Sequence, residues 1–457
     1  MKILLIEPCT NPIVIGSDDF SMYEPLALEY VAAGVADKHE VKILDLRIEN
    51  NLQATFEKFL PDIVGITAYT VHVNTVLQLF KKIKEWNPQV LTVVGGHHAT
   101  IVPDDFNSEY IDIIVMGEGI FTFREIVNNF EKGKSYENIP GIASSINGQL
   151  KKSQPVGNVD LDEFPFPRRE LTSEYRDLYY SYWMKPLATM RTSKGCPYRC
   201  NFCAMWKLAD GKYYKRRPEK IVEELEGIIE EYVFFADDES LLDAQRMKLL
   251  AELIKQKGIK KKYFLYGRSD TITKNPDLIR QWRDIGLERV FVGLEFFREE
   301  DLKYISKKST VDDNNKAVKI LQDLGIDIYA SMIVRPDFTK EDFADLRAYV
   351  RKLKLDFAGF AVLTPLPGTD LFKEMETSLI TRNYDYFDFI HTVLPTQLSL
   401  KEFYKEYLNL YKKGISRWRS LATLKKYPRT EILPLIKKSI HTYKRFEEAY
   451  LDYEIGN

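Results

Sequence analysis

The most constraining feature of this 457-residue chain is a repeated alternation of short apolar runs with stretches of helical periodicity. Strands alternating with helices predict a doubly wound α/β domain on a parallel sheet, which we place at residues 1–140. Its apolar runs, typical of buried strands, occupy residues 2–6, 41–46, 63–67, 90–94 and 111–115, with helical patterns at 26–36, 52–59 and 73–86.

A second block of the same alternation follows a predicted linker at residues 141–185, where Leu161–Pro167 holds too many prolines for a helix. Six strand candidates recur, at 188–192, 232–236, 263–266, 289–294, 328–334 and 359–363. Six βα units predict a partial (β/α)6 TIM-like barrel at residues 186–370, with function at the carboxyl ends of its strands. Residues 371–457 are predicted to form a helical C-terminal region.

Bulk properties narrow the class of protein. A formal net charge of −2 gives no overall basic field for nucleic acid, so we predict no nucleic-acid partner. No run of about eighteen apolar residues suggests a membrane span, and Met1–Glu7 does not resemble a signal peptide. Only four cysteines are present, which favours a reducing, cytoplasmic location.

Three of those cysteines are crowded together as Cys196, Cys200 and Cys203. Thiolates at this C-x3-C-x2-C spacing can bind three irons of a [4Fe-4S] cluster and leave the fourth iron open to a small molecule. A structural zinc site would need a fourth ligand, and the remaining cysteine, Cys9, is far away in the sequence. Three crowded cysteines also argue against a disulfide framework.

The segment Met190–Cys203 resembles the cluster motif of the radical S-adenosylmethionine (radical SAM) superfamily. The resemblance implies that SAM chelates the open iron, and that one electron splits it into methionine and a 5′-deoxyadenosyl radical. An external donor of the flavodoxin or ferredoxin type would supply that electron. Phe202, the aromatic before the last cysteine, would lie near the adenine.

Residues at the other barrel strand ends are implied to bind SAM: Asp237, Asp238, Arg268, Glu295, Ser331 and Pro365. Each of the charged ones has a structural alternative. The aspartates can cap the next helix, and Arg268 and Glu295 can form ordinary ion pairs. Gly293–Phe297 and Val334–Thr339 lack glycines that family members often carry, which bears on the shape of the SAM pocket.

Loops at the strand ends of the first domain resemble the cobalamin-binding domain found ahead of many radical SAM domains. No G-x-G-x-x-G fingerprint is present, which disfavours a dinucleotide. The cobalt-ligating D-x-H-x-x-G pattern is also absent, and we predict packing or hydrogen-bonding roles for His72, His97 and His98. The resemblance assigns these residues to cobalamin: Gly65, Thr67, Tyr69, Thr70, Gly95, Gly96, His97, Gly117, Glu118 and Gly119.

The C-terminal region is basic. Residues 412–445 hold eleven lysines and arginines against one acid, Glu431, with apolar residues interleaved. Such a segment can lie on an anionic membrane surface or pack as a solvated helical pair on the barrel. Tyr384, Tyr386 and His391 either border the substrate or pack beneath the barrel mouth. The segments Tyr384–Thr396 and Leu398–Tyr411 resemble the hopanoid C-3 methylase branch, near the anaerobic magnesium-protoporphyrin cyclases.

Together these resemblances predict a cobalamin-dependent methyltransferase that uses a [4Fe-4S] cluster, SAM and cobalamin. The deoxyadenosyl radical would activate a carbon of a lipid-like or isoprenoid substrate, and methylcobalamin would supply the methyl group. An oxidative cyclase or ring-rearranging enzyme with the same cofactors is the first alternative. An iron–sulfur electron carrier or a cobalamin sensor without turnover is the second.

Overall fold

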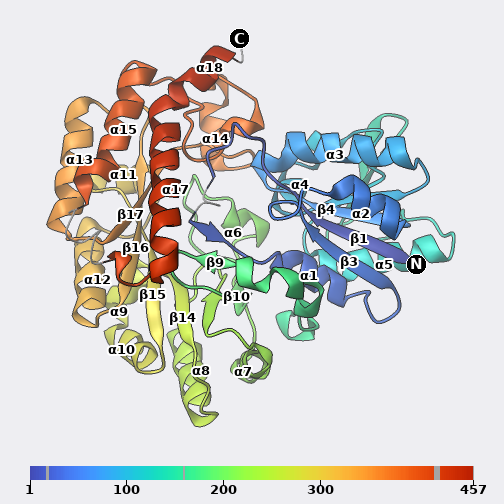
Figure 1. Cartoon of the computed structure of the whole chain (residues 1–457), viewed down its shortest axis with the longest axis horizontal. Coiled ribbons are helices and arrows are strands. Elements are labelled where there is room, and N and C mark those ends of the chain that lie inside the picture. Colours follow the sequence, from blue (N-terminus) through green and yellow to red (C-terminus); the bar gives the residue numbers. More distant parts are fainter. Residues whose placement is uncertain (17–19, 158–159, 416–422, 456–457) are drawn as a thin grey trace. The chain divides into compact units, whose positions relative to one another are not determined.

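A computed structural model describes the chain except for residues 17–19, 158–159, 416–422 and 456–457 (Figure 1). The chain divides into two compact units. The first unit comprises Met1–Val14, Glu24–Asp177 and Asn383–Asp385. The second comprises Ile15–Tyr23, Leu178–Arg382 and Tyr386–Asn457.

The first unit is built on a seven-stranded sheet in the order β3-β1-β4-β5-β6-β7-β8. The first five strands in this order are parallel, as predicted, and β7 and β8 are antiparallel additions. The strands are β1 (Lys2–Glu7), β3 (Glu40–Asp45), β4 (Ile63–Thr67), β5 (Leu91–Gly95), β6 (Ile113–Val115), β7 (Ile142–Ile146) and β8 (Gln149–Lys152).

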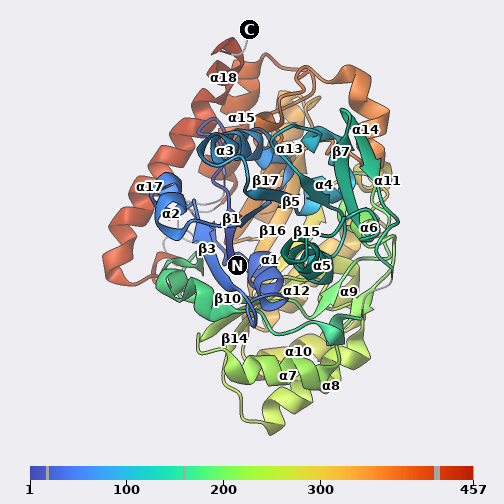
Figure 2. The same ribbon diagram turned by 90° about the vertical axis from the view of Figure 1, so that its right-hand side faces the viewer.

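Alternation along the strands gives this sheet two buried faces. Ile3 and Leu5 pack with helices α1 (Leu26–Ala33) and α5 (Gly119–Glu131). Leu4 and Ile6 point the other way, toward α2 (Leu52–Phe59) and α3 (Val73–Trp86). Figure 2 shows α3 and α5 on opposite sides of β1 and β5. Burial on both faces explains why these strands are continuous apolar runs.

Residues 141–152, which the sequence analysis assigned to a linker, form β7 and β8 at the edge of the first sheet. The rest of that segment, up to Asp177, also belongs to the first unit. The buried hydroxyl of Thr172 donates to Glu29 of α1 at 2.5 Å. An edge hairpin with polar residues lacks the apolar run on which the prediction relied, which explains the difference.

The second unit holds six parallel strands in sequence order: β10 (Leu187–Met190), β13 (Tyr232–Phe235), β14 (Lys262–Arg268), β15 (Leu287–Glu295), β16 (Asp327–Val334) and β17 (Phe357–Val362). The helices between them include α7 (Pro218–Gly227), α8 (Ala244–Gln256), α10 (Pro276–Asp284), α12 (Val311–Asp323) and α13 (Lys340–Lys352). This is the predicted partial barrel. The short helices α9 (Ser269–Lys274) and α11 (Glu299–Tyr304) were not predicted.

The C-terminal region is helical, with α15 (Leu400–Gly414), α17 (Arg429–Glu448) and the short α18 (Asp452–Ile455). Tyr407 of α15 and Phe446 of α17 join the barrel's hydrophobic core. Two arginines of the basic segment, Arg417 and Arg419, lie outside the described residues. Within the described ranges, no helix combines the length and apolar character needed to cross a bilayer.

Candidate cofactor-binding sites

The three clustered cysteines lie in one loop after β10, beyond the short strand β11 (Ser193–Lys194). Cys200 is buried, and Cys196 and Cys203 are half-buried. The Trp206 indole N–H donates to the Cys200 carbonyl at 3.0 Å, and the Cys203 N–H donates to the same oxygen at 3.2 Å. These two hydrogen bonds hold the backbone of the cysteine loop at Cys200.

Two aspartates that follow β13 anchor the start of this loop. Asp237 accepts hydrogen bonds from the Thr192 and Ser193 N–H groups at 2.7 and 2.8 Å, and from the Thr192 hydroxyl at 2.5 Å. Asp238 accepts from the N–H of Gly195, the residue before Cys196, at 2.6 Å. Both carboxylates, which the sequence analysis placed beside SAM, thus hold the backbone that leads into the cysteines.

The C-x3-C-x2-C spacing of the three thiols suits a four-iron cluster, in which each cysteine binds its own iron. Burial raises the pKa of Cys196 to about 11 and that of Cys203 to about 12. A bound metal would offset this effect, since coordination deprotonates a thiol.

Glu239, at the same strand end, is a buried acid that the sequence analysis did not single out. One of its oxygens accepts from the Arg268 N–H at 2.9 Å, and the other, Oε1, has no hydrogen-bond partner. Burial raises the pKa of Glu239 to about 8. A buried carboxylate oxygen without a partner marks a place where a cation or donor binds. Its position at the end of the Asp237–Glu239 triplet is the signal that could have identified it.

Arg268 lies beside this acid at the end of β14. Its Nε donates to Asp270 at 2.9 Å, and its guanidinium carbon lies 3.6 Å from the centre of the Tyr198 ring. Nη2 has no hydrogen-bond partner. The residue forms the ion pair that the sequence analysis gave as its alternative role, yet it keeps one donor for a ligand.

Glu295 ends β15 in an unusual conformation. Its φ is +62°, in the left-handed region that favours glycine, and its carboxylate pairs with Lys307 at 2.7 Å. A Cβ on Gly293 would lie 2.4 Å from Glu295 Oε1, so the glycine makes room for the folded-back side chain. Such strain clusters at functional sites. Ser331 lies within β16, in register with Gly359 of β17, and Pro365 lies beyond the end of β17.

In the first unit, the residues predicted to bind cobalamin follow three neighbouring strands, β4, β5 and β6. The loops are tied together. The Ala68 N–H donates to the Gly95 carbonyl at 2.9 Å, and the Gly117 N–H to the Thr100 hydroxyl at 3.0 Å. The carboxyl-end edge of these strands holds the other predicted residues, which are Thr67, Tyr69, Thr70, Gly96, His97, Glu118 and Gly119. Gly65 lies inside β4, where a Cβ would meet Leu5 at 2.9 Å, so packing explains it.

His72 and His98 of these loops make hydrogen bonds, as the sequence predicted, and His97 contacts the ring of Tyr69. Burial lowers the pKa of His72 to about 4, and its Nδ1 lies 3.4 Å from the Tyr69 nitrogen. Both ring nitrogens of His98 have partners, Thr70 at 3.1 Å and Asp105 at 2.8 Å. The His97 ring lies 4.9 Å from that of Tyr69, which is half exposed.

Gly96→Ala should disrupt this edge. Gly96 has φ +100°, and a Cβ there would lie 2.7 Å from both the Ala68 nitrogen and the Thr67 hydroxyl. We expect the variant to lose cobalamin, measured by absorbance after gel filtration, and to keep a cluster. Gly157→Ala is the control, because this residue lies in the same unit outside the cobalamin loops and a Cβ there would meet no atom within 4 Å. Equal cobalamin retention in both variants would contradict this description of the loops.

The three candidate substrate residues Tyr384, Tyr386 and His391 lie in different parts of the structure. Tyr384 belongs to the first unit, where its hydroxyl donates to Asp105 at 2.7 Å. Tyr386 donates to the Asp452 carbonyl at 2.7 Å in the second unit. His391 is fully buried between Asp388 at 2.7 Å and Asp452 at 2.9 Å. The described contacts of His391 are those of a structural ion pair.

His391 should make stability depend on pH. Burial opposes its charge, but Asp388 and Asp452 outweigh burial and raise its pKa to about 9. A raised pKa stabilises the fold below the unfolded value of about 6.5, and this stabilisation disappears as the pH passes through 9. We expect the free energy of unfolding in urea to fall by about 3 kcal/mol over this range. His391→Gln should remove the dependence and His441→Gln, at an exposed site, should keep it.

Comparison with known proteins agrees with this arrangement. Residues 190–350 match the radical SAM superfamily and residues 14–127 match the B12 binding domain. The hopanoid C-3 methylase of Methylococcus capsulatus is 31% identical over 93% of this chain and 83% of its own length. An uncharacterized methyltransferase of Pyrococcus horikoshii is 32% identical, covering 90% of both chains.

Solved structures share the fold. The cobalamin-dependent radical enzyme OxsB superposes with a TM-score of 0.73 at 17% identity, over 98% of this chain and 72% of its own. The radical SAM methyltransferase TsrM from Kitasatospora setae superposes with a TM-score of 0.66 at 20% identity, over 82% of this chain and 75% of its own. A cysteine loop at a barrel's strand ends, a second sheet with five parallel strands, and relatives matched along nearly the whole chain lead to one conclusion. The chain belongs to the cobalamin-dependent radical SAM superfamily, whose cofactors are a [4Fe-4S] cluster, SAM and cobalamin.

Proposed function

We propose that the protein methylates an unactivated carbon of a hydrophobic substrate. The observation that carries the proposal is the identity of 31% to the hopanoid C-3 methylase over 93% of this chain. When bound, reduced cluster and SAM supply a radical that removes hydrogen, and cobalamin supplies the methyl group. The protein contributes two rigid strand-end platforms that position these cofactors.

Residue roles follow from the contacts. Cys196, Cys200 and Cys203 would hold the cluster, and Phe202, next to the last cysteine, would border SAM. The unpaired Oε1 of Glu239 and Nη2 of Arg268 suit the ammonium and carboxylate of SAM. Glu295, Ser331 and Pro365 would line the rest of that site. Asp237 and Asp238 act as positioning residues. The strand-end residues from Thr67 to Gly119 would hold cobalamin.

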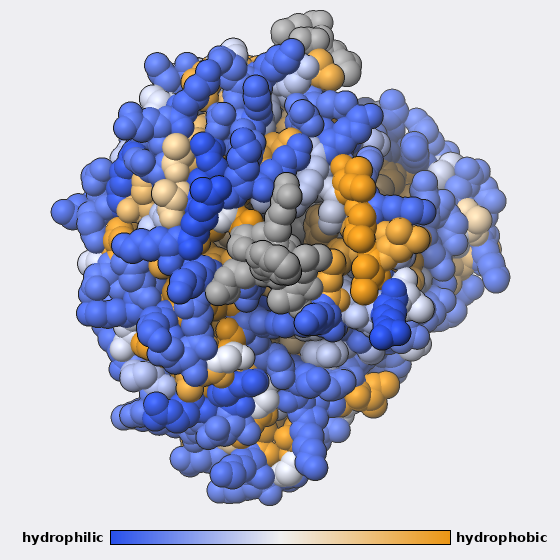
Figure 3. All heavy atoms as spheres, turned by 60° about the vertical axis from the view of Figure 1, so that its left-hand side comes forward, coloured by the Kyte–Doolittle hydropathy of each residue, from blue (hydrophilic) through white to orange (hydrophobic). Residues whose placement is uncertain are grey.

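The exposed face of α17 is also consistent with a hydrophobic substrate that is reached at a membrane surface. Leu433, Ile436 and Ile440 are exposed on this helix by 62%, 41% and 63%. Lys437 and Lys444 are exposed beside them. Figure 3 shows hydrophobic side chains grouped on a face that is otherwise largely hydrophilic. Basic helices with an apolar face bind anionic membrane surfaces, and an apolar substrate would be met there.

Co-sedimentation with phosphatidylglycerol vesicles tests the membrane role. We expect the wild-type protein to sediment with these vesicles and a Leu433→Ser/Ile440→Ser variant to remain in solution. Phosphatidylcholine vesicles are the control, because they lack the anionic surface. Equal partitioning of both proteins would remove the membrane role and leave the reaction proposal untouched.

The reaction itself is tested by products. Anaerobic incubation with reductant, deuterium-labelled SAM and a lipid extract should yield a labelled lipid, with 5′-deoxyadenosine and S-adenosylhomocysteine in equal amounts. Deoxyadenosine without S-adenosylhomocysteine would favour a radical cyclisation instead. That second candidate has support, since the anaerobic magnesium-protoporphyrin IX monomethyl ester cyclase of Rubrivivax gelatinosus is 26% identical over 76% of this chain and 64% of its own.

A further inference from the structure

The interior of the barrel is aromatic toward the amino-terminal ends of its strands. Alternate residues of the strands pack outward against the helices, and these are mostly aliphatic. The inward positions carry rings in mutual contact, and the loop before β10 adds two more. The rings are Phe234, Phe264, Tyr266, Phe291, Tyr329 and Phe357, with Tyr182 and Trp183 from the loop.

The guanidinium of Arg289 is buried among these rings. It has no solvent exposure, and its Nε, Nη1 and Nη2 atoms all lack hydrogen-bond partners. Its guanidinium carbon lies 4.3 Å from the centre of the Trp183 ring, 4.5 Å from Tyr182 and 4.7 Å from Phe357. Ring faces attract a cation but accept no conventional N–H hydrogen bond. A buried guanidinium with every donor unused therefore calls for an acceptor.

Phenol groups surround the same point. The Tyr182 ring lies 4.5 Å from the guanidinium carbon. Burial raises the pKa of Tyr23 and of Tyr182, and the charge of Arg289 opposes that effect in both cases. Tyr329 raises the pKa of both of these tyrosines, and its ring centre lies 5.7 Å from the guanidinium carbon of Arg289. Asp327, the residue that pairs in register with Arg289 on β16, is already paired with Lys426. The phenol hydroxyls and the guanidinium therefore provide hydrogen-bond donors, which suit an oxoanion.

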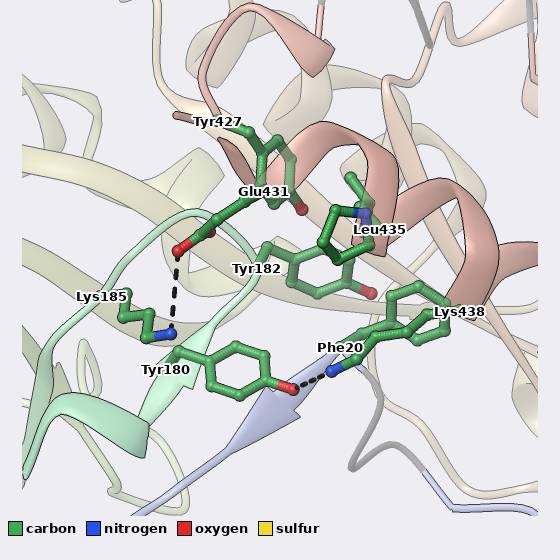
Figure 4. A pocket seen from close by; sticks show the side chains of 9 residues that line it. Phe20, Tyr180, Tyr182, Lys185, Tyr427, Glu431, Leu435 and Lys438 are labelled. Atoms are coloured by element: carbon green, nitrogen blue, oxygen red, sulfur yellow. Dashed lines mark hydrogen bonds and ion pairs between the residues drawn. The ribbon is translucent and has the colours of Figure 1, made fainter. Parts of the chain in front are cut away.

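A pocket of about 260 Å³ lies against this cluster, and Tyr182 lines both (Figure 4). Its walls are apolar and aromatic, from Phe20, Tyr180, Tyr182, Tyr427, Pro434 and Leu435. The charges that line it already have partners. Lys185 lies 3.7 Å from Glu431, and Lys438 donates to the Tyr180 hydroxyl at 3.0 Å. Arg289 is thus the cation beside the pocket whose donors are unused.

We propose that this pocket and Arg289 form a binding site for an amphiphilic carboxylate, with the apolar body in the pocket and the carboxylate on Arg289. A planar guanidinium matches a carboxylate through two parallel hydrogen bonds. The ring of Tyr182 separates the two halves and must turn aside for the ligand. The site lies apart from the cofactor-binding strand ends, because Arg289 lies near the start of β15 and Glu295 ends this strand.

Equilibrium binding of a matched pair of probes, decanoate and methyl decanoate, tests the site in the cluster-loaded protein. We expect decanoate to bind about tenfold tighter than its uncharged ester, because only the carboxylate satisfies the guanidinium. Arg289→Met should abolish this preference and bind both probes equally. Lys262→Met is the matched control. Lys262 lies 5.3 Å from the centre of the Tyr232 ring and pairs with Glu231 at 2.8 Å, so its loss should leave the preference intact.

The melting temperature separates ligand binding from a purely structural role. Replacing an unpaired buried charge by an apolar side chain of similar length is often neutral or stabilising, so Arg289→Met should melt at or above the wild-type temperature. A lower melting temperature that Arg289→Lys restores would show a structural cation–aromatic box and overturn the proposal. Equal wild-type affinity for both probes would also overturn it. Neither the probe affinity nor the melting temperature requires turnover. Both experiments therefore test the carboxylate site independently of the proposed methylation.

Discussion

Cys200→Ala is expected to abolish the iron–sulfur cluster and all cleavage of SAM. With two thiolates left, the loop can no longer bind three irons, and the open iron that SAM needs is lost with the cluster. The chestnut absorbance of the reconstituted protein should disappear, and 5′-deoxyadenosine should fall to background in an anaerobic assay. Cobalamin should remain bound, because its loops lie in the first unit.

Cys9→Ala is the control for this experiment. Cys9 packs beside the hydrophobic core of the first unit and lies outside the motif. The variant should load a cluster and form deoxyadenosine like the wild-type protein. Retained SAM cleavage in Cys200→Ala, or equal losses in both variants, would show that the assignment of the cluster ligands is wrong.

Asp237→Ala is expected to have the second largest effect, although the residue binds no metal. The change strips acceptors from the Thr192 and Ser193 N–H groups and from the Thr192 hydroxyl, all of which are buried. Each unsatisfied buried donor costs about 1–3 kcal/mol, so the free energy of unfolding should fall by about 3 kcal/mol or more. The cysteine loop loses its anchor, and iron content after reconstitution should drop with it.

Two variants of nearby acids make this result interpretable. Asp243→Ala removes the cap of α8, where the carboxylate accepts from the Arg246 N–H, and a solvent-exposed ion pair with Lys215. It should therefore cost about 1 kcal/mol and keep the cluster. Glu239→Gln should also keep the cluster but weaken SAM binding, because the unpaired oxygen beside Arg268 loses its charge. Full iron loading of Asp237→Ala would contradict the positioning role.

Residues with a strong periodic or motif signal were predictable from the sequence. The barrel strands appear where apolar runs stand between helical patterns, and β4, α2 and α3 have the predicted bounds. The cysteine spacing alone indicated the cluster. Cobalamin entered through resemblance, since Gly95–Gly96 and Gly117–Gly119 are compatible with many ligands before a family is considered.

Other features depend on contacts that no local pattern encodes. The hairpin of β7 and β8 carries polar residues, and a period-two edge signal over five residues is weak. The pairing of Glu295 with Lys307, the anchoring role of Asp237 and the orphan oxygen of Glu239 arise only when strand ends meet in space. Arg289 is an ordinary strand residue in the sequence, and its isolation is visible only inside the barrel.

The most direct test of the account is the electron paramagnetic resonance spectrum of the reduced cluster, recorded before and after adding SAM. Three cysteine ligands leave one iron open, so SAM binding at that iron should shift the g values of the wild-type protein. Arg268→Met and Glu239→Gln should reduce the shift at a given SAM concentration while leaving the cluster signal in place. A cluster signal that saturating SAM leaves unchanged would contradict the account.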